Sequence, residues 1–388
     1  MPPRVNAGPR PLGSDAMKTR LARQALSEAL TAVAAVTGGR TTKPILGCVR
    51  LEVSGTRLEL CGTDGEVALR VGITTIASDR PGVAVLPTDR LLGIIRELDD
   101  VEVMLDADDK ACTIRGDGSE FKIFGMSAAD FPPVPQMTGE PELVLAGSEL
   151  RRMVALTSYA AARESSRYAI NGVLWDRRGK RLFMVATDGR RLARAGGTLR
   201  EARGADFQLI VPSKALGVVE RVFAPPKAEE DWTVEVRVLP NQIILRSGDR
   251  VIASALVEGN FPKYEDVIPK ESSRHAKLET GEFHAAIRRA ALLTTEDSRA
   301  VRLSFGPERL VITASSPEQG EARVEVPVQY TGEPLDIGFN PAFVADALKV
   351  LPYREVLIDM QESARPGVLS GGDANEFLYV LMPVALTP

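Results

Sequence analysis

The chain repeats one arrangement of segments three times, and this repetition constrains its fold more than any other feature. Each copy has an amphipathic helix, a pair of alternating strands, a second helix and a further strand. The helices are predicted at 20–33, 86–98, 148–161, 211–223, 281–294 and 339–351. Thr63, Thr187 and Ser315 hold matching positions, at spacings of 124 and 128 residues. Because a repeat of this length is a whole domain, the chain is predicted to form three similar domains in tandem.

Each domain is expected to hold two helices and roughly eight strands, an α+β fold in which helices pack on one face of antiparallel sheets. Stretches punctuated by Pro and Gly, 124–135 and 255–269, are expected to link the domains. The predicted boundaries are 17–136, 140–268 and 273–388, after a disordered N-terminal extension, 1–16.

Composition indicates a soluble globular chain, with 44% hydrophobic and 26% charged residues. No stretch approaches the ~20 apolar residues of a membrane helix, and the N-terminal residues lack the apolar core of a signal peptide. Cys48, Cys61 and Cys112 lie far apart in strand-like runs, which favours buried reduced thiols over a disulfide frame or a metal site. The chain is therefore expected to be cytoplasmic, without membrane contact.

The residues that most enzymes use are scarce. His275 and His284 are the two histidines, and the chain has no phosphate-binding P-loop, HExxH, dinucleotide-binding or nucleophile-elbow motif. Asp64 and Asp188 are explained as residues of Asp-Gly turns. A carboxylate-dependent hydrolase or nuclease stays as the alternative class, and a bound divalent metal would favour it. The main expectation is a protein that is not an enzyme and needs no cofactor.

Charge is distributed unevenly. The whole chain has a net charge of −4, but the six predicted helices carry eleven basic and seven acidic side chains. These helices are either ordinary solvated faces or a basic surface within an acidic chain, which would attract a phosphate backbone. Arg40, Arg163 and Arg167, in loops that follow the first helices, favour the second interpretation. Aromatic residues are too few, at 5%, for stacking on single strands.

Nine segments resemble one family, in its order and spacing, from about Met17 to Leu386. They are KPILG (43–47), GTDGE (62–66), SAADFPPVP (127–135), RYAING (167–172), VATDGRRLA (185–193), VPSKAL (211–216), GNFPKYEDVIPK (259–270), IGFN (337–340) and MPVAL (382–386). Together they resemble the bacterial replicative sliding clamp, the β subunit of DNA polymerase III.

The resemblance implies a head-to-tail homodimeric ring whose helices line a central hole around duplex DNA. Such a ring is a non-catalytic processivity factor that tethers the replicative polymerase through sequence-independent contacts. The implied partners are duplex DNA, a second copy, the polymerase III alpha subunit, the clamp loader, and other polymerases or repair proteins that carry a short clamp-binding peptide. The alternative is a clamp paralogue serving repair or drug tolerance, with an altered peptide pocket.

The resemblance also assigns site residues. The DNA-facing set is Arg20, Arg23, Arg40, Arg90, Arg96, Arg151, Arg152, Tyr168, Lys214, Arg221, Arg288, Arg289 and Lys349. The partner-peptide pocket is Ile170, Thr187, Gly189, Arg190, Arg191, Leu192, Pro262, Val267, Val380, Leu381, Met382, Pro383, Val384 and Leu386. The dimer interface is Phe121 and Ile123 of one chain against Leu292 and Leu293 of the other, four residues that core packing would explain equally well.

Three departures from the family pattern concern the pocket. Arg190 stands where the family often has His, Ala169 where it has Tyr, and Val384-Ala385-Leu386 where it has Met-Arg-Leu. Thr387 and Pro388 extend the chain further. Without the resemblance, MPVAL would be interpreted as a last strand that frays into solvent.

Overall fold

The computed structural model describes residues 16–39, 41–108, 110–163, 169–223, 231–294, 300–317, 319–372 and 376–386. The α-helices found there are α1 (Arg23–Thr37), α2 (Thr88–Glu97), α3 (Gly147–Thr157), α4 (Ser213–Val222), α5 (Thr280–Ala291) and α6 (Pro341–Val350). Internal packing divides the described chain into two compact units. Unit 1 extends to Glu142 and includes Gly217–Ala255, and unit 2 comprises Leu143–Leu216 and the residues from Leu256 onward.

Unit 1 contains two runs of antiparallel strands. Its strands are β1 (Met17–Ala22), β2 (Cys48–Ser54), β3 (Arg57–Thr63), β4 (Val67–Thr74), β5 (Ala77–Arg80), β6 (Gly82–Pro87), β7 (Glu102–Ala107), β8 (Ala111–Gly116), β9 (Ser119–Phe124), β16 (Thr233–Leu239), β17 (Gln242–Ser247) and β18 (Arg250–Ala255). One run has the order β5-β1-β7-β8-β9 and the other β16-β17-β18-β4-β3-β2-β6. Strand β18 pairs with β4, far earlier in the chain, with Arg250 opposite Val71 and Ser254 opposite Val67.

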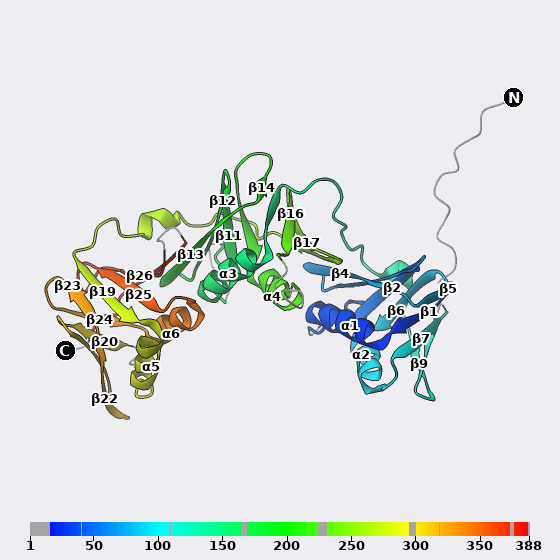
Figure 1. The fold of residues 1–388 in the computed structure, drawn as a ribbon, viewed down its shortest axis with the longest axis horizontal. Coiled ribbons are helices and arrows are strands. Elements are labelled where there is room, and N and C mark those ends of the chain that lie inside the picture. The colour runs from blue at the N-terminus through cyan, green and yellow to red at the C-terminus, as the bar shows by residue number, and fades with distance from the viewer. Residues whose placement is uncertain are drawn as a thin grey trace. The chain divides into compact units, whose positions relative to one another are not determined.

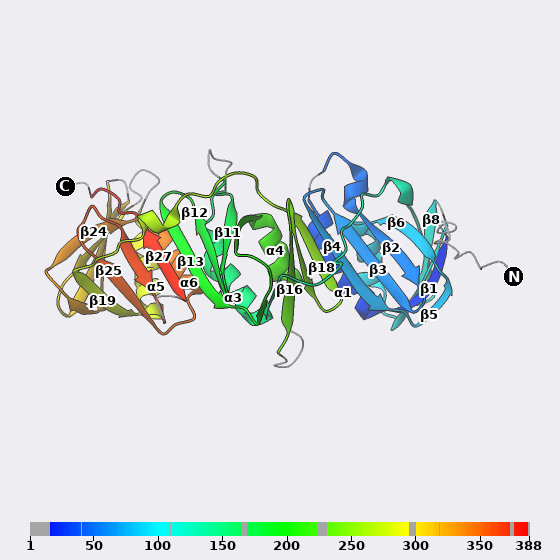
Figure 2. The ribbon, with the colours of Figure 1, turned by 90° about the horizontal axis from the view of Figure 1, so that it is seen from above.

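Unit 2 is built in the same way. Its strands are β10 (Leu143–Ala146), β11 (Gly172–Arg178), β12 (Arg181–Thr187), β13 (Arg191–Thr198), β14 (Glu201–Ala202), β15 (Phe207–Pro212), β19 (Arg274–Glu279), β20 (Val301–Phe305), β21 (Arg309–Ser316), β22 (Gly320–Pro327), β23 (Gln329–Thr331), β24 (Leu335–Phe339), β25 (Glu355–Met360), β26 (Gly367–Ser370) and β27 (Phe377–Leu381). One sheet has the order β15-β11-β12-β13-β27-β26-β25-β19-β23, and a smaller one has β22-β21-β20-β24. Strand β27 pairs with β13, with Leu381 opposite Arg191. Figure 2 shows β12, β13 and β27 side by side.

Helices cover the sheets on one face within each unit. In unit 1, α1 and α2 lie next to each other against the strands (Figure 1), and α1 buries Leu26, Leu30 and Val33 there. Gly62 of β3 permits this close approach, because a Cβ atom at that position would lie 2.6 Å from Cγ1 of Val33. In unit 2, α3 packs on β12 and β13, and α5 packs on β21 and β22 and against α6.

The sequence prediction starts the first helix, 20–33, three residues before the helix in the structure. Residues Met17–Ala22 form strand β1, with Met17, Thr19 and Leu21 fully buried and Arg20 exposed between them. Alternation of buried and exposed residues is the pattern of a strand. The prediction that Arg20 lies on a helix is therefore wrong, because Arg20 lies on strand β1. Helix α1 begins at Arg23.

Candidate functional site

The 187–191 segment of the predicted peptide pocket forms a tight turn between β12 and β13. Oγ1 of Thr187 donates to the Arg191 carbonyl at 2.6 Å and accepts from Gly189 N–H at 3.1 Å. Oδ1 of Asp188 accepts from the N–H groups of Arg190, at 2.9 Å, and Arg191, at 3.1 Å. Gly189 has a φ of 85°, which few other residues adopt without strain. The prediction that Asp188 is a turn residue is confirmed.

Arg191 enters the unit interior directly after this turn, and its side chain is almost fully buried. Its guanidinium donates to Oδ2 of Asp188 at 3.0 Å, Oδ2 of Asp346 at 2.8 Å and the Tyr159 carbonyl at 2.8 Å. Its Cζ atom lies 5.6 Å from the ring centre of Tyr159 and 4.3 Å from that of Phe343. Arg191 therefore connects the start of β13 to α6 and to the turn after α3.

Two tyrosines extend this buried cluster. The rings of Tyr159 and Tyr379 lie 5.7 Å apart, and the Tyr379 hydroxyl donates to the Phe343 carbonyl at 2.9 Å. Burial raises the pKa of both hydroxyls above the ordinary tyrosine range. The folded unit therefore favours the neutral hydroxyl at both positions, although the buried Tyr159 hydroxyl has no hydrogen-bond partner among the described residues.

An apolar layer forms on the sheet beside the turn. Leu192 of β13 and Val380 of β27 belong to one buried cluster with Tyr264, against which Phe261 and Ile268 pack. Of the predicted pocket residues, the buried ones are Ile170, Thr187, Arg191, Leu192, Val380 and Leu381. The exposed ones are Gly189, Arg190, Val267, Met382 and Val384, and the half-buried ones are Pro262, Pro383 and Leu386. All of them belong to unit 2, so the structure brings this predicted set onto one compact unit.

The segment after β27 is held in place by hydrogen bonds. Met382 N–H donates to the Arg190 carbonyl at 3.0 Å, and Val384 N–H donates to the Gly338 carbonyl at 2.8 Å. The segment lies close over Gly338, where a Cβ atom would be 2.6 Å from the Val384 carbonyl oxygen and 2.7 Å from Cδ2 of Leu386. The alternative that MPVAL frays into solvent is wrong for these residues. Thr387 and Pro388 lie outside the described residues.

The predicted DNA-facing residues fall into three groups. The exposed ones on helices are Arg90, Arg96, Lys214, Arg221, Arg288, Arg289 and Lys349, and Arg151 is half-buried. A further group consists of Arg20, which lies 3.7 Å from Glu102, Arg23, which donates to the Asp100 carbonyl at 3.0 Å, and Arg152, which donates to Glu149 and to the Gly196 carbonyl. Two of the exposed residues also have protein partners: Arg96 donates to Oγ1 of Thr31, and Arg221 donates to the Gly217 carbonyl, each at 3.0 Å. Arg40 and Tyr168 lie outside the described residues.

The pKa of His284, on α5, is lowered by its surroundings. His284 is half-buried, and burial, Arg288 and Lys349 together lower its pKa below the ordinary histidine value. Arg288 and Lys349 therefore add positive charge near His284.

The predicted dimer residues differ in accessibility. Strand β9 forms an edge of its sheet, and on it Phe121 is 37% exposed whereas Ile123 is buried. Leu292, just beyond α5, is 76% exposed, and Leu293 is half-buried. Sequence reasoning missed Phe124, which is 70% exposed at the end of the same edge strand. An aromatic residue at a strand end, next to a Gly, was the signal that could have identified it.

No helix there combines the length and apolar character needed to cross a membrane. No group of three or more His, Cys, Asp or Glu residues could hold a metal ion in that part of the chain.

Three family models match the chain in order. They describe the N-terminal domain of the DNA polymerase III beta subunit, over 17–135, its central domain, over 144–263, and its C-terminal domain, over 265–385. The expected fold of three tandem clamp domains is thereby confirmed.

Relatives match over nearly the whole chain. The beta sliding clamp of Salmonella typhimurium is 33% identical, with 95% of this chain and all of the relative covered. A crystal structure of the Pseudomonas aeruginosa sliding clamp bound to griselimycin is 32% identical with a TM-score of 0.90, and covers 96% of this chain and all of that one. The Bacillus subtilis clamp has the same TM-score and coverage at 25% identity. The chain belongs to the DNA polymerase III beta subunit family, the bacterial beta sliding clamps.

Proposed function

We propose that this protein is a homodimeric ring that encircles duplex DNA and tethers the replicative polymerase, as a non-catalytic processivity factor in the cytoplasm. Membership of the sliding clamp family is the observation that carries this proposal. A closed ring holds DNA by topology, so its contacts can stay weak and sequence-independent. Tethering keeps the polymerase at high effective concentration near the primer end. The domain boundaries at 17–136, 140–268 and 273–388 belong to the same proposal.

Exposed basic side chains on the helices are proposed to face the DNA. Arg288 and Arg289 near the end of α5 and Lys349 near the end of α6 are all exposed. Such side chains neutralise phosphates without reading bases. Arg20 and Arg152 are weaker candidates, because both already have acidic protein partners.

The surface beside the Thr187–Leu192 turn is proposed to take the short peptide of polymerase and loader. Buried Leu192 and Val380 provide an apolar base, and Met382, 45% exposed, provides a flexible side chain that can adapt to several partners. The related Pseudomonas aeruginosa clamp binds griselimycin, so a clamp of this fold has a surface that holds a ligand. Exposed Arg190 stands at the rim, where it would favour acidic residues next to the apolar anchors of a peptide.

Ring closure is proposed to use edge strand β9 of one chain and the end of α5 in the other. Phe121, Phe124 and Leu292 supply exposed apolar area at these places. We therefore add Phe124 to the proposed interface and expect Ile123 to support it from inside the unit.

The experiment compares nicked circular DNA with the same DNA after linearisation. The loaded protein should stay on the circle at moderate salt and leave once the DNA is cut, because only topology retains it. The double variant Arg288→Glu, Arg289→Glu should load more slowly at low salt, and the difference should shrink as salt rises. Equal retention on circular and linear DNA would contradict the proposal.

A further inference from the structure

The segment between Phe261 and Ile268 in unit 2 carries two of the residues proposed for the peptide surface. Phe261 and Ile268 pack against the apolar cluster at the two ends of this segment. Between them Tyr264 is only 5% exposed, whereas the residues around it, 263 and 265–267, are exposed. Tyr264 is therefore the side chain that fixes the middle of the segment.

The Tyr264 hydroxyl is held by two residues of strand β11. It donates to Oδ2 of Asp176 at 2.8 Å and accepts from Nη2 of Arg178 at 3.0 Å. Arg178 also donates to Oδ2 of Asp176 at 2.6 Å and to Oε1 of Glu265 at 2.7 Å. Burial disfavours the charged carboxylate, but the hydrogen bonds from Arg178 and Tyr264 hold the pKa of Asp176 below its usual range. These four side chains, which we call the Tyr264 clasp, connect the segment to the sheet.

The clasp controls the place of an exposed residue. Tyr264–Val267 forms one turn of 3₁₀ helix, in which side chains three positions apart lie above each other, so Val267 stands next to Tyr264. Val267 is 48% exposed. Tyr264 also shares one buried cluster with Leu192 and Val380, the apolar base proposed for the peptide surface. One buried side chain therefore sets the spacing between this base and an exposed wall.

The segment is longer than its counterpart in unit 1. The linker FPPVP (131–135) has five residues, whereas FPKYEDVIP (261–269) has nine, and the four extra residues include Tyr264. Val134 packs against the core of unit 1, as Ile268 packs against that of unit 2. The shorter linker is therefore enough to cover the sheet.

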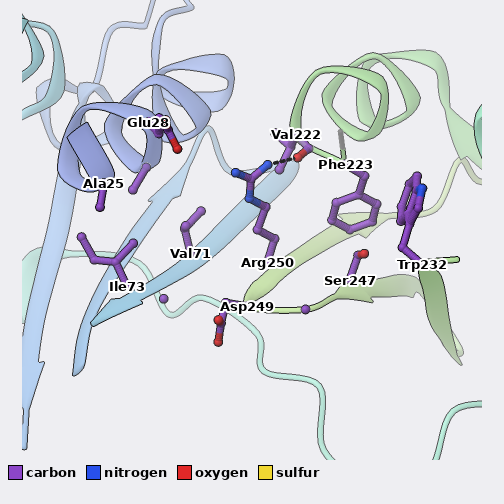
Figure 3. Close-up of a pocket in the computed structure, with 13 residues that line it drawn as sticks. Ala25, Glu28, Val71, Ile73, Val222, Phe223, Trp232, Ser247, Asp249 and Arg250 are labelled. Atoms are coloured by element: carbon purple, nitrogen blue, oxygen red, sulfur yellow. Dashed lines mark hydrogen bonds between the residues drawn. The ribbon is translucent and has the colours of Figure 1, made fainter. Parts of the chain in front are cut away.

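Unit 1 also uses the corresponding carboxylate differently. At the repeat spacing of 124 residues, Glu52 holds the position of Asp176, and it is paired with Arg50 at 2.7 Å. Unit 1 is held together elsewhere, for example by Arg250, which donates to the Val222 carbonyl (Figure 3). Because the repeated fold forms there without a tyrosine clasp, the clasp in unit 2 serves a purpose beyond the fold.

We propose that Tyr264 is a positioning residue for the clamp-binding peptide: through Asp176 and Arg178 it fixes Val267 at the place where the peptide docks. This inference rests on the peptide surface proposed above and adds to it a buried residue that the peptide does not need to touch. Releasing the hydroxyl should then lower the affinity for the peptide.

The test measures binding of a fluorescein-labelled Gln-Leu-Ala-Leu-Phe peptide to the full chain by fluorescence polarisation. Tyr264→Phe keeps the ring, removes the hydroxyl and should weaken the peptide about fivefold. Tyr330→Phe is the matched control, because the Tyr330 hydroxyl, also in unit 2, donates to the Glu333 carbonyl at 2.6 Å. It should lower the urea midpoint to a similar extent and leave the peptide affinity unchanged.

Further measurements separate positioning from simple destabilisation. Asp176→Asn should also weaken the peptide, and the double variant with Tyr264→Phe should lose no more than the larger single loss, because both act through one hydrogen bond. Without peptide, the Val267 methyl signals should shift in Tyr264→Phe and stay in place in Tyr330→Phe. Deletion of 263–266 gives the linker the length of 131–135, so the chain should fold but bind the peptide at least about tenfold more weakly.

Three results would overturn the inference: an unchanged affinity in Tyr264→Phe, an equal loss in Tyr330→Phe, or Val267 methyl signals that do not respond to the loss of the hydroxyl. If the unaltered chain does not bind the peptide, the peptide surface proposed above is wrong as well. Normal binding by the unaltered chain and by Tyr264→Phe alike would contradict the role of Tyr264 and leave the proposed function in place.

Discussion

The two places where distant strands join a sheet, β4 with β18 in unit 1 and β13 with β27 in unit 2, share one backbone design. Thr63 and Thr187 make the same pair of turn hydrogen bonds. Ala255 N–H donates to the Glu66 carbonyl at 3.0 Å, and Met382 N–H donates to the Arg190 carbonyl at the same distance. The backbone of the junction is therefore conserved between the copies within this chain.

The side chains at the two junctions differ. Val67 in unit 1 holds the position of Arg191 in unit 2, where the guanidinium connects two acidic residues and two aromatic rings. Unit 1 is held instead by Arg250 on the Val222 carbonyl and by the Arg57–Asp249 pair. The comparison teaches that a duplicated sheet junction can keep its backbone while different side chains hold it in the two copies.

The largest effect is expected from Arg191→Met. This change removes the buried donor of the Tyr159 carbonyl and of Asp346, whose side chain is 44% exposed, so the free energy of unfolding of unit 2 should fall by about 2 kcal/mol. Urea unfolding followed by the fluorescence of Trp175, in a Trp232→Phe background, measures it. A loss no greater than that of Arg250→Met in unit 1 would remove the distinction between the junctions.

Gly338→Ala should displace the segment that follows β27. Its Cβ would lie 2.6 Å from the Val384 carbonyl oxygen, so the segment must move away from β24. The affinity for a Gln-Leu-x-Leu-Phe type peptide should fall about tenfold, since ~1.4 kcal/mol corresponds to that factor. Fluorescence polarisation measures it. Gly306→Ala, where the nearest atom is 3.5 Å away, is the matched control and should bind peptide normally.

Arg250→Met should cost unit 1 about 1 kcal/mol of its free energy of unfolding. The substitution removes one hydrogen bond to the Val222 carbonyl and keeps much of the apolar stem. Trp232 fluorescence during urea unfolding, in a Trp175→Phe background, reports on this unit. A loss as large as that of Arg191→Met would show that both junctions depend on a single arginine.

Raising the pH should lower the free energy of unfolding of the two units through different titrating groups. The effect should be smallest near neutral pH. Burial raises the pKa of Cys61 and Cys112 in unit 1 to about 12, and burial raises that of Tyr379 in unit 2. A group that binds its proton more tightly when folded stabilises the fold below its unfolded pKa, and this contribution is lost as pH rises. Unit 1 should therefore weaken from about pH 8.5 upward and unit 2 from about pH 10 upward.

Urea midpoints between pH 8 and pH 11, read from the two single-tryptophan backgrounds, test this order. Cys61→Ala with Cys112→Ala should flatten the pH dependence of unit 1 and leave that of unit 2 unchanged. A steeper decline in unit 1 after these substitutions would contradict the assignment to the thiols.

Sequence patterns predicted the parts of the molecule that are set locally. The Thr-Asp-Gly turns need only neighbouring residues, and each of the six helices lies where apolar spacing placed it, apart from its ends. Arg20 was misplaced because Met17–Ala22 alternates over too few residues to separate it from the helix that follows. Fold prediction succeeded because three copies carry the same local signals.

Long-range contacts could not be predicted in this way. Asp346 lies 155 residues from Arg191, and nothing local links them. Arg152 looked like a free basic residue, yet besides the nearby Glu149 it contacts a backbone carbonyl 44 residues away.

The pairing of Val71 with Arg250 has a consequence for how the chain folds. These residues are 179 positions apart, so most local contacts of unit 1 can form long before the sheet is complete. Contacts of such high sequence separation slow folding and favour partly folded intermediates. During that interval β4 is an open edge with unpaired N–H and carbonyl groups, able to pair with a strand from another nascent chain. Timely arrival of β18 thus protects the growing chain from misassembly.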